Sequence, residues 1–137
     1  MAQLQLEVVT PERRVLSEGV DSVVIPGLGG ELGILPGHTP LISQLKTGVL
    51  SYTQGGRTVQ LLVSGGFLEV RDDHVSVLAE IAERPEEIDA AGARVAREQV
   101  EKRLNSWSGS EEDLETARIE LDRATVRLQL VTGKTTN

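Results

Sequence analysis

The side chains that could do chemistry in this chain are few, and their spacing assembles no catalytic group. His38 and His74 fall in different predicted turns, and the chain has no cysteine, so a zinc site with nitrogen or sulfur ligands is not expected. Ser64 precedes Gly65 and Gly66, which is not the Gly-x-Ser-x-Gly pattern of hydrolase nucleophiles. No glycine-rich loop with lysine, as in phosphate-binding loops, is present. We therefore expect a protein that acts by contact and is not an enzyme.

The densest run of special residues is Gly30–His38, which reads GELGILPGH. Glycine permits backbone conformations closed to other residues, and proline fixes one dihedral angle, so this run predicts a rigid loop. We expect its polar side chains, Glu31 and His38, to point outward as contact residues, since rigid loops present binding groups well. For His38 the alternative is a hydrogen bond within its own loop. The aliphatic side chains expected to point inward are Leu32, Ile34 and Leu35.

The charge balance excludes several classes of partner. The net charge of −7 argues against a nucleic-acid binder, which needs a basic face, and against direct docking on anionic lipid. The N-terminal run MAQLQLE has neither a basic region nor a long apolar stretch, so we expect no signal or transit peptide. No stretch has the length of a transmembrane helix. We expect a cytosolic protein that reaches a membrane only through partners.

Alternation of apolar and polar residues predicts short strands through residues 1–84. Aliphatic side chains must form the core, since aromatic residues make up only 2% of the chain. Turns are predicted at Gly55-Gly56 and Asp72-Asp73, and breaks between strands at Pro26-Gly27 and Gly65-Gly66. The pattern is typical of an antiparallel β-sandwich or barrel. The alternating apolar residues include Leu4, Leu6, Val8, Val59, Leu61, Val63, Leu68, Val70, Val75, Val77 and Ala79.

Residues 85–137 read as an antiparallel two-helix hairpin with a short disordered tail after Gly133. Pro85 is followed by two glutamates, which suits a helix start, so a first helix is expected from residue 86 or 87 to about Leu104. A polar turn around Trp107 follows. Ser110 precedes Asp113 by three residues, in the manner of a helix cap, so a second helix is expected over residues 111–131.

The two helices have unequal apolar faces. Leu114, Ala117, Leu121, Ala124, Leu128 and Val131 follow three-four spacing on the second helix. The first helix answers mainly with Ala90, Ala91, Gly92, Ala93 and Ala96, joined by Val95, Val100 and Leu104. Small side chains bury little apolar area, so we expect a hairpin that forms but is only modestly attached to the sandwich. A permanently docked helical cap is the alternative. Trp107 is expected either to pack on its own helix ends or to anchor a partner.

Two segments carry a resemblance to a known family. Gly30–His38 and Ser64–Val70 (SGGFLEV) resemble the two signatures of the epsilon subunit of bacterial and chloroplast F-type ATP synthases. The resemblance extends over nearly the whole chain, including its helical third. It implies a non-catalytic central-stalk subunit of a proton-translocating enzyme, peripheral at the cytoplasmic face of a bacterial membrane or, alternatively, at a plastid thylakoid.

The family resemblance also implies roles for particular residues. The sandwich would contact the gamma subunit on one face and the c-ring at the loop that carries Glu31 and His38. The hairpin would extend along gamma to the alpha and beta catalytic subunits and inhibit ATP hydrolysis. Arg118, Arg123 and Arg127 would then meet acidic segments of those subunits.

A further part of the resemblance concerns ATP. The segment Ile88–Ala93 (IDAAGA) is similar to a motif that binds ATP in some epsilon subunits, and Ile88, Asp89 and Ala93 match it. Gly92 replaces the arginine of that motif, which removes a cationic phosphate donor. The resemblance also implies Glu83, Arg123 and Arg127 around the nucleotide. We therefore expect no cofactor, with ATP at most a weak regulatory ligand; an ordinary solvated helix is the alternative.

Two other classes of protein stay open at this point. The first is a stand-alone nucleotide-binding sandwich whose helical hairpin closes as a lid. The second is a general adaptor with a helical interaction arm. Stable recovery with gamma would separate the stalk subunit from both, because a free ligand binder would elute alone.

Overall fold

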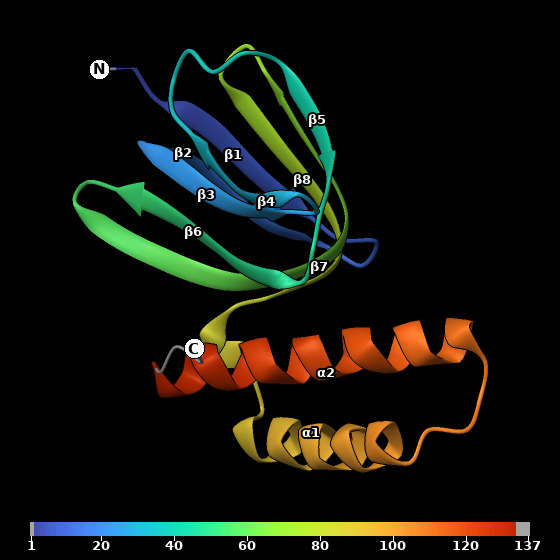
Figure 1. The fold of residues 1–137 in the computed structure, drawn as a ribbon. Coiled ribbons are helices and arrows are strands. Elements are labelled where there is room, and N and C mark those ends of the chain that lie inside the picture. The colour runs from blue at the N-terminus through green and yellow to red at the C-terminus, as the bar shows by residue number, and fades with distance from the viewer. Residues whose placement is uncertain (1, 134–137) are drawn as a thin grey trace.

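The computed structural model describes residues 2–133 as an eight-stranded β domain followed by two antiparallel helices (Figure 1). The expected fold class, a sandwich plus a helical hairpin, is confirmed. The tail expected over residues 134–137 lies outside the described residues. The strands are β1 (Leu4–Val9), β2 (Arg14–Val20), β3 (Ser22–Gly27), β4 (Gly30–Ile34), β5 (Leu41–Gln44), β6 (Gly48–Gln54), β7 (Arg57–Arg71) and β8 (His74–Glu83).

The strands are hydrogen-bonded in the order β2-β1-β8-β7-β6-β3-β4, with β5 paired to β7. Every pair is antiparallel except β1 with β8, which is parallel. Gly55-Gly56 and Asp72-Asp73 form the two predicted hairpin turns, and all four residues have positive φ. The prediction of a break at Pro26-Gly27 is wrong. Strand β3 continues through both residues, and the turn follows at Leu28-Gly29.

Strand β7 does not end at Gly65-Gly66, as the alternation predicted. It continues through both glycines, which have φ of 71° and 98°. Its first half pairs with β6 and its second half with β5, so the strand bends between them (Figure 1). A Cβ atom at residue 66 would collide with the carbonyl oxygen of Leu78. Glycine is therefore needed for the bend, and the bend places Ser64 on the end of the sandwich that faces the helices.

The core of the β domain is aliphatic, as the composition predicted, and includes Tyr52 as its aromatic member. Its side chains come from every strand except β5, with Leu41 of β5 packed partly buried against it. Leu32 and Ile34 point inward as expected. The same prediction for Leu35 is wrong, because its side chain is 63% exposed. The polypeptide leaves β4 at Ile34, so Leu35 already lies in the loop, where the alternation of the strand no longer applies.

The helical part begins with a 3₁₀ turn, η1 (Pro85–Glu87), and continues as α1 (Ala90–Asn105) and α2 (Glu111–Thr132). The expected start of the first helix at residue 86 or 87 is wrong, because Glu87 bends back to accept the Arg84 amide and closes the 3₁₀ turn. Asp89 then caps α1 by accepting the Gly92 amide at 3.1 Å. Ser110 caps α2 as predicted, accepting the Asp113 amide at 3.1 Å.

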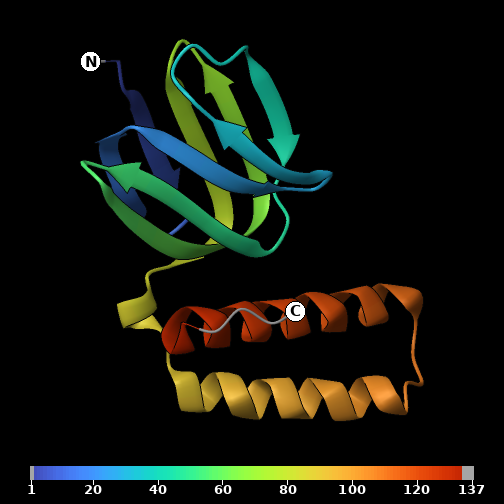
Figure 2. The same cartoon turned by 60° about the vertical axis from the view of Figure 1, so that its left-hand side comes forward.

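Helix α2 lies between the sandwich and α1 (Figures 1 and 2). The predicted seam is partly confirmed: Ala117, Ala124 and Leu128 are buried, and Ala93 and Val100 answer them from α1. Val95 was expected on this seam but is exposed. Val126 is also buried, although it lies off the predicted seam.

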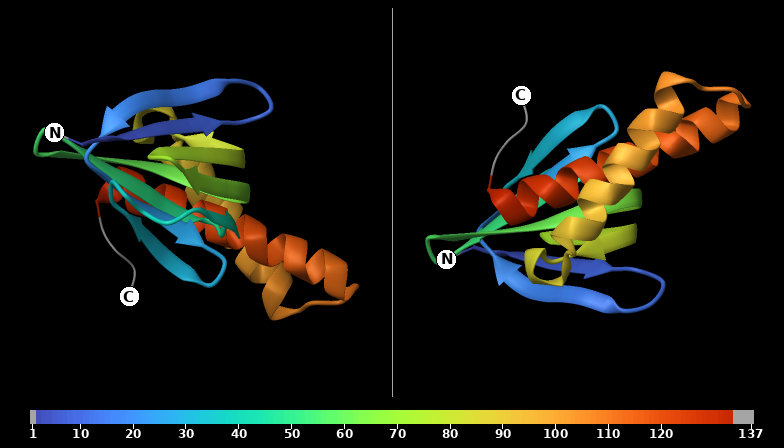
Figure 3. Two further views of the ribbon diagram at one scale, coloured as in Figure 1. Left: turned by 90° about the horizontal axis from the view of Figure 1, so that it is seen from above. Right: turned by 90° about the horizontal axis from the view of Figure 1, so that it is seen from below.

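The turn between the helices projects beyond the edge of the sandwich in both views of Figure 3. Trp107 lies in this turn and is half-buried. Its ring lies so close to Gly109 that a Cβ there would be 3.1 Å from the ring. The tryptophan therefore packs on its own turn, which is the first of the two expectations.

Candidate functional site

The junction between the sandwich and α2 is held by two arginines. Arg127 binds Glu83 at the end of β8 through two parallel hydrogen bonds, from Nε to Oε1 at 2.8 Å and from Nη2 to Oε2 at 2.9 Å. The two side chains are 26% and 27% exposed. This fork geometry is the strongest common form of ion pair between side chains. The hydrogen bonds from Arg127 to Glu83 raise the pKa of the guanidinium further, so the arginine stays charged.

Arg123 lies one turn earlier on α2 and binds a second set of partners. Its Nε donates to Ser64 Oγ at 2.7 Å, and its Nη2 lies 3.2 Å from Glu80 Oε2. Ser64 is fully buried and also bonds Thr47 Oγ1 at 2.7 Å. The Glu80 carboxylate lies over Gly65, where a Cβ would be only 2.6 Å from Oε2. The glycine bend of β7 thus forms the socket that receives Arg123.

The segment between the domains is fixed by further polar contacts. Arg13 pairs with Glu87 at 2.7 Å, and Arg84 Nη2 donates to the carbonyl oxygen of Val15 at 2.8 Å. The hydrogen bond from Arg13 lowers the pKa of Glu87. These contacts hold η1 against the β domain, while α1 itself packs mainly on α2.

The residues that the family resemblance connects with ATP are largely brought together. Glu83, Ile88, Asp89, Ala93 and Arg127 all line one open cleft of about 270 Å³. Gly92 lines it too, so the missing arginine would have projected from its wall. Arg123 does not line this cleft but a second one of about 440 Å³. Arg127 uses Nε and Nη2 on Glu83 in this state, so these two donors are not available to a phosphate.

The second cleft lies between α2 and the sandwich and was not anticipated from the sequence. Lys46, Glu115, Asp122 and Arg123 contribute charges to it, beside the apolar Leu28 and Ile119. Burial raises the pKa of Asp122, with Lys46 opposing the shift and Glu115 adding to it. Three-four spacing could have flagged Asp122, because it lies three residues after Ile119, which lines the same cleft.

Glu31 and His38 lie at opposite ends of β4. Glu31 follows the β3–β4 turn, opposite Pro26, and His38 lies in the loop after the strand. Glu31 is exposed, as expected, whereas His38 is half-buried. His38 Nδ1 lies 2.7 Å from the carbonyl oxygen of Thr39, so the hydrogen bond within the loop is present. Asp73 of the β7–β8 turn accepts the Gly37 amide at 2.7 Å, an unpredicted contact that ties the loop to the rest of the sandwich.

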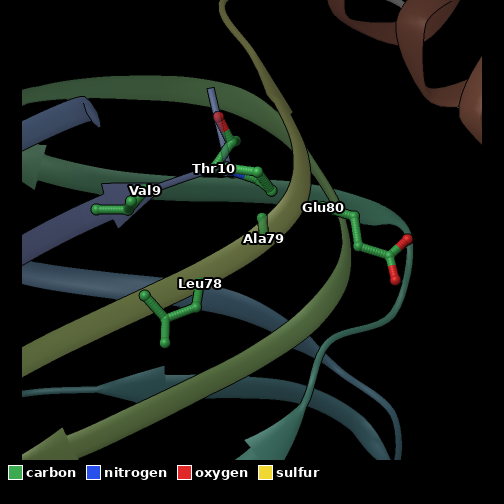
Figure 4. A pocket seen from close by; sticks show the side chains of 6 residues that line it. Val9, Thr10, Leu78, Ala79 and Glu80 are labelled. Atoms are coloured by element: carbon green, nitrogen blue, oxygen red, sulfur yellow. The ribbon is translucent and has the colours of Figure 1, made fainter. Parts of the chain in front are cut away.

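Large apolar side chains lie exposed on the outer face of the β domain. Phe67 and Leu78 are directly opposite each other on β7 and β8 and are 53% and 57% exposed, and Ile42 of β5 is 71% exposed. Val9 pairs with Leu78 from the other side, where a shallow groove runs along β1 and β8 (Figure 4). We call these four residues the apolar face. Large apolar residues at outward positions of the alternation were the sequence signal for it.

Comparison with known proteins decides the family. Sequence models of the ATP synthase delta/epsilon chain match in two parts, the beta-sandwich domain over residues 3–85 and the long alpha-helix domain over residues 86–132. The chain belongs to the ATP synthase delta/epsilon family. The ATP synthase epsilon chain of Desulforamulus reducens is 49% identical over 130 residues, which are 94% of this chain and 98% of that protein. The epsilon chain of Herpetosiphon aurantiacus is 49% identical over 93% of each chain.

Solved structures agree with this family assignment. A chain of the Euglena gracilis mitochondrial ATP synthase, in a structure of OSCP, F1 and c-ring, has 31% identity and a TM-score of 0.76 over 90% of this chain and 78% of that one. A chain from the Tetrahymena thermophila mitochondrial ATP synthase central stalk and c-ring has 12% identity and a TM-score of 0.62, over 95% and 97% of the two chains, and so shares the fold alone. The family resemblance read from Gly30–His38 and Ser64–Val70 is confirmed.

Proposed function

We propose that this chain is the epsilon subunit of the central stalk of an F-type ATP synthase, without catalytic residues of its own. The observation that supports it most is that both parts of the epsilon family, sandwich and helices, match along residues 3–132. The sandwich holds the rotor together, and the hairpin limits ATP hydrolysis. No helix within residues 2–133 is long and apolar enough to cross a membrane. Attachment to the cytoplasmic face of a bacterial membrane, or to a thylakoid, comes through partners.

The apolar face is the surface we assign to the gamma subunit. Phe67, Leu78 and Ile42 are exposed beside one another on neighbouring strands, and an exposed apolar patch on a folded domain usually marks an interaction site. Burying it against gamma would supply the apolar centre that stable interfaces need. Phe67→Asp should abolish recovery of the chain with gamma, whereas Glu69→Gln, a change on the same strand, should not. Undiminished recovery of the Phe67 variant would overturn this assignment.

Glu31 and His38 are the residues we assign to the c-ring contact. Glu31 is exposed near the start of β4, and the half-buried His38 lies in the loop that Asp73 holds. Their support is the family resemblance, together with the exposure of Glu31 and the fixed loop that carries His38. Substituting both by alanine should lower proton-driven ATP synthesis in the assembled enzyme without affecting the stability of the chain. Unchanged synthesis would argue that this end of the sandwich carries no coupling contact.

The hairpin is the part we assign to inhibition. Its second helix carries Arg118, Arg123 and Arg127, which are placed to meet acidic segments of the alpha and beta subunits once the hairpin extends. The decisive experiment is the ATPase rate of the assembled enzyme with the full chain and with a chain that ends at residue 85. The hydrophobic core of the β domain lies within residues 4–82, so the shortened chain retains it. Hydrolysis should rise on truncation, and an unchanged rate would reject the inhibitory role.

ATP is the second candidate ligand, favoured by the cleft that Glu83, Ile88, Asp89, Ala93 and Arg127 share. We propose that it binds weakly here, because Gly92 supplies no cation and Arg127 is paired with Glu83. Isothermal titration should show little heat below millimolar ATP. Gly92→Arg should tighten binding by about tenfold, since a charge-assisted hydrogen bond contributes on the order of 1.5–3 kcal/mol. No heat from either protein would remove ATP as a ligand.

A further inference from the structure

The two arginines at the junction match the two carboxylates of β8 one to one. Arg123 and Arg127 lie one helical turn apart on α2, and they bind Glu80 and Glu83 at the end of β8. The third arginine of the inhibitory set, Arg118, is exposed and has no hydrogen-bond or ion-pair partner among residues 2–133. The packed state in Figure 1, which we call docked, therefore occupies two of the three arginines and leaves one free.

While the carboxylates of β8 bind Arg123 and Arg127, no other acidic group can bind the same donors of these arginines. A guanidinium remains charged at all physiological pH values, so it must always be matched by water or by an anion. Arg127 uses Nε and Nη2 on Glu83, and Arg123 uses Nε on the buried Ser64 and Nη2 on Glu80. These are the donors that face the sandwich. They become available to another protein only when α2 leaves it.

We propose that Glu80 and Glu83 are an internal substitute for the acidic partner of α2. They hold the arginines in the docked state and must be displaced before the hairpin can engage another subunit. The inference rests on the proposed function and adds the residues that regulate it. The carboxylates and the arginines should therefore have opposite effects on inhibition of ATP hydrolysis. Loss of the carboxylates should increase inhibition. Loss of the arginines should undock the hairpin and also prevent inhibition.

The docking half of the proposal can be tested on the isolated full chain. Because the chain has no cysteine, Thr58→Cys on β7 and Glu112→Cys on α2 give two unique sites for spin labels, and pulsed electron resonance then measures their separation. The double variant Glu80→Gln with Glu83→Gln should raise the ratio of undocked to docked molecules about tenfold, the effect of about 1.4 kcal/mol. Glu86→Gln, an exposed neighbour with no side-chain partner among residues 2–133, is the matched control and should change nothing.

Exchanging the charges of Glu83 and Arg127 distinguishes loss of the ion pair from general structural damage. Glu83→Arg alone should undock the hairpin, and adding Arg127→Glu should restore docking by re-forming the pair in reverse. High salt should lower docking in the wild type and have a smaller effect in the Gln variant. A Gln double variant that stays as docked as the wild type would overturn the proposal, whatever the hairpin does in the enzyme.

The regulatory half is tested by ATP hydrolysis of the assembled enzyme. The Glu80 and Glu83 double variant should lower hydrolysis several-fold, and the Arg123→Gln with Arg127→Gln double variant should raise it. If truncation at residue 85 raises hydrolysis but the Gln variant neither undocks nor inhibits, the proposed function stands and this inference falls. If truncation does not change the hydrolysis rate, the proposed function falls. If the Gln double variant undocks the hairpin but does not increase inhibition, the proposal that Glu80 and Glu83 take the place of the acidic partner is overturned.

Discussion

The β domain and the hairpin are stabilised in different ways. Fully buried Leu, Ile and Val side chains fill the sandwich, including Leu6, Ile25 and Leu50. The helices bury few residues, and three of these, Ala93, Ala117 and Ala124, are alanines. Burying a large aliphatic side chain contributes about 1.5–3 kcal/mol, far more than an alanine does. The junction between the two parts relies on arginine and carboxylate groups that water can also satisfy.

On the proposed function, this difference separates a permanent body from a detachable arm. Apolar side chains have a lower free energy in the core than in water, so the sandwich has one favourable arrangement. Polar groups can exchange one partner for another at small net change in free energy, so α2 can leave its site without a large penalty. The four predictions below test how far the two parts differ, from the largest expected effect to the smallest.

The largest effect is expected in the sandwich core. Leu50 is fully buried, so Leu50→Ala should lower the free energy of unfolding of the β domain by about 3 kcal/mol, through lost apolar burial and the cavity left behind. Urea unfolding of the full chain would measure it. Leu35→Ala, at an exposed position, should change the value by less than about 0.5 kcal/mol. Equal effects at the two sites would contradict the assigned core.

The second effect should be confined to the hairpin. Leu128→Ala removes the largest buried side chain of α2 on the α1 side and should destabilise the helices by about 2 kcal/mol. Trp107 lies in the hairpin and Tyr52 in the sandwich, and each is the single residue of its kind. The Trp107 fluorescence transition should move to lower urea while the Tyr52 near-ultraviolet signal stays in place. Transitions that move together would show one cooperative unit and reject the division into body and arm.

A smaller effect is expected at the cap of α2. Ser110 accepts the Asp113 amide, so Ser110→Ala should lower helix stability by about 1 kcal/mol. Thermal loss of helical circular dichroism measures this change. Ser108→Ala, two residues earlier in the same turn and with no side-chain partner among residues 2–133, is the control. A control variant that loses as much would show that the whole turn, and not the cap, is responsible.

The smallest effect is a pH dependence of docking. Burial raises the pKa of Asp122 in the docked state, so the protonated form favours docking. Its contribution is fully present below the ordinary carboxyl pKa of about 4 and is lost as pH rises through the raised value. The contribution of Asp122 to the docked fraction, measured with the spin-label pair as the difference between the wild type and Asp122→Asn, should therefore fall slightly over this range. Asp122→Asn should remove that part of the pH dependence, and an unchanged slope would show that another group titrates.

Sequence patterns predicted those features that depend on interactions between residues close together in the chain. Alternation identified the inward side chains of the strands, and the Gly55-Gly56 and Asp72-Asp73 turns followed from residues that tolerate positive φ. The cap at Ser110 and the length of α2 were readable for the same reason. The family resemblance added what the patterns alone could not, namely the partners and the direction of regulation that we propose.

Long-range contacts explain the failures. Helix α1 starts later than expected because Arg13, over seventy residues earlier in the chain, holds Glu87 in a 3₁₀ turn. Asp73 fixes the loop at Gly37 from a different hairpin. The pairing of Arg127 with Glu83 joins residues 44 positions apart. No periodicity in the sequence reports such contacts, because they arise only once the domains pack.

The bend of β7 at Gly65-Gly66 has a consequence for how the sandwich comes apart. One strand supplies hydrogen bonds to β6 before the bend, to β5 after it, and to β8 on both sides. Peeling either half away would disturb the other, so neither has an independent opening of low energy. In hydrogen–deuterium exchange, the amides of β6 and β8 should therefore lose protection at one common rate, the rate at which the entire domain melts.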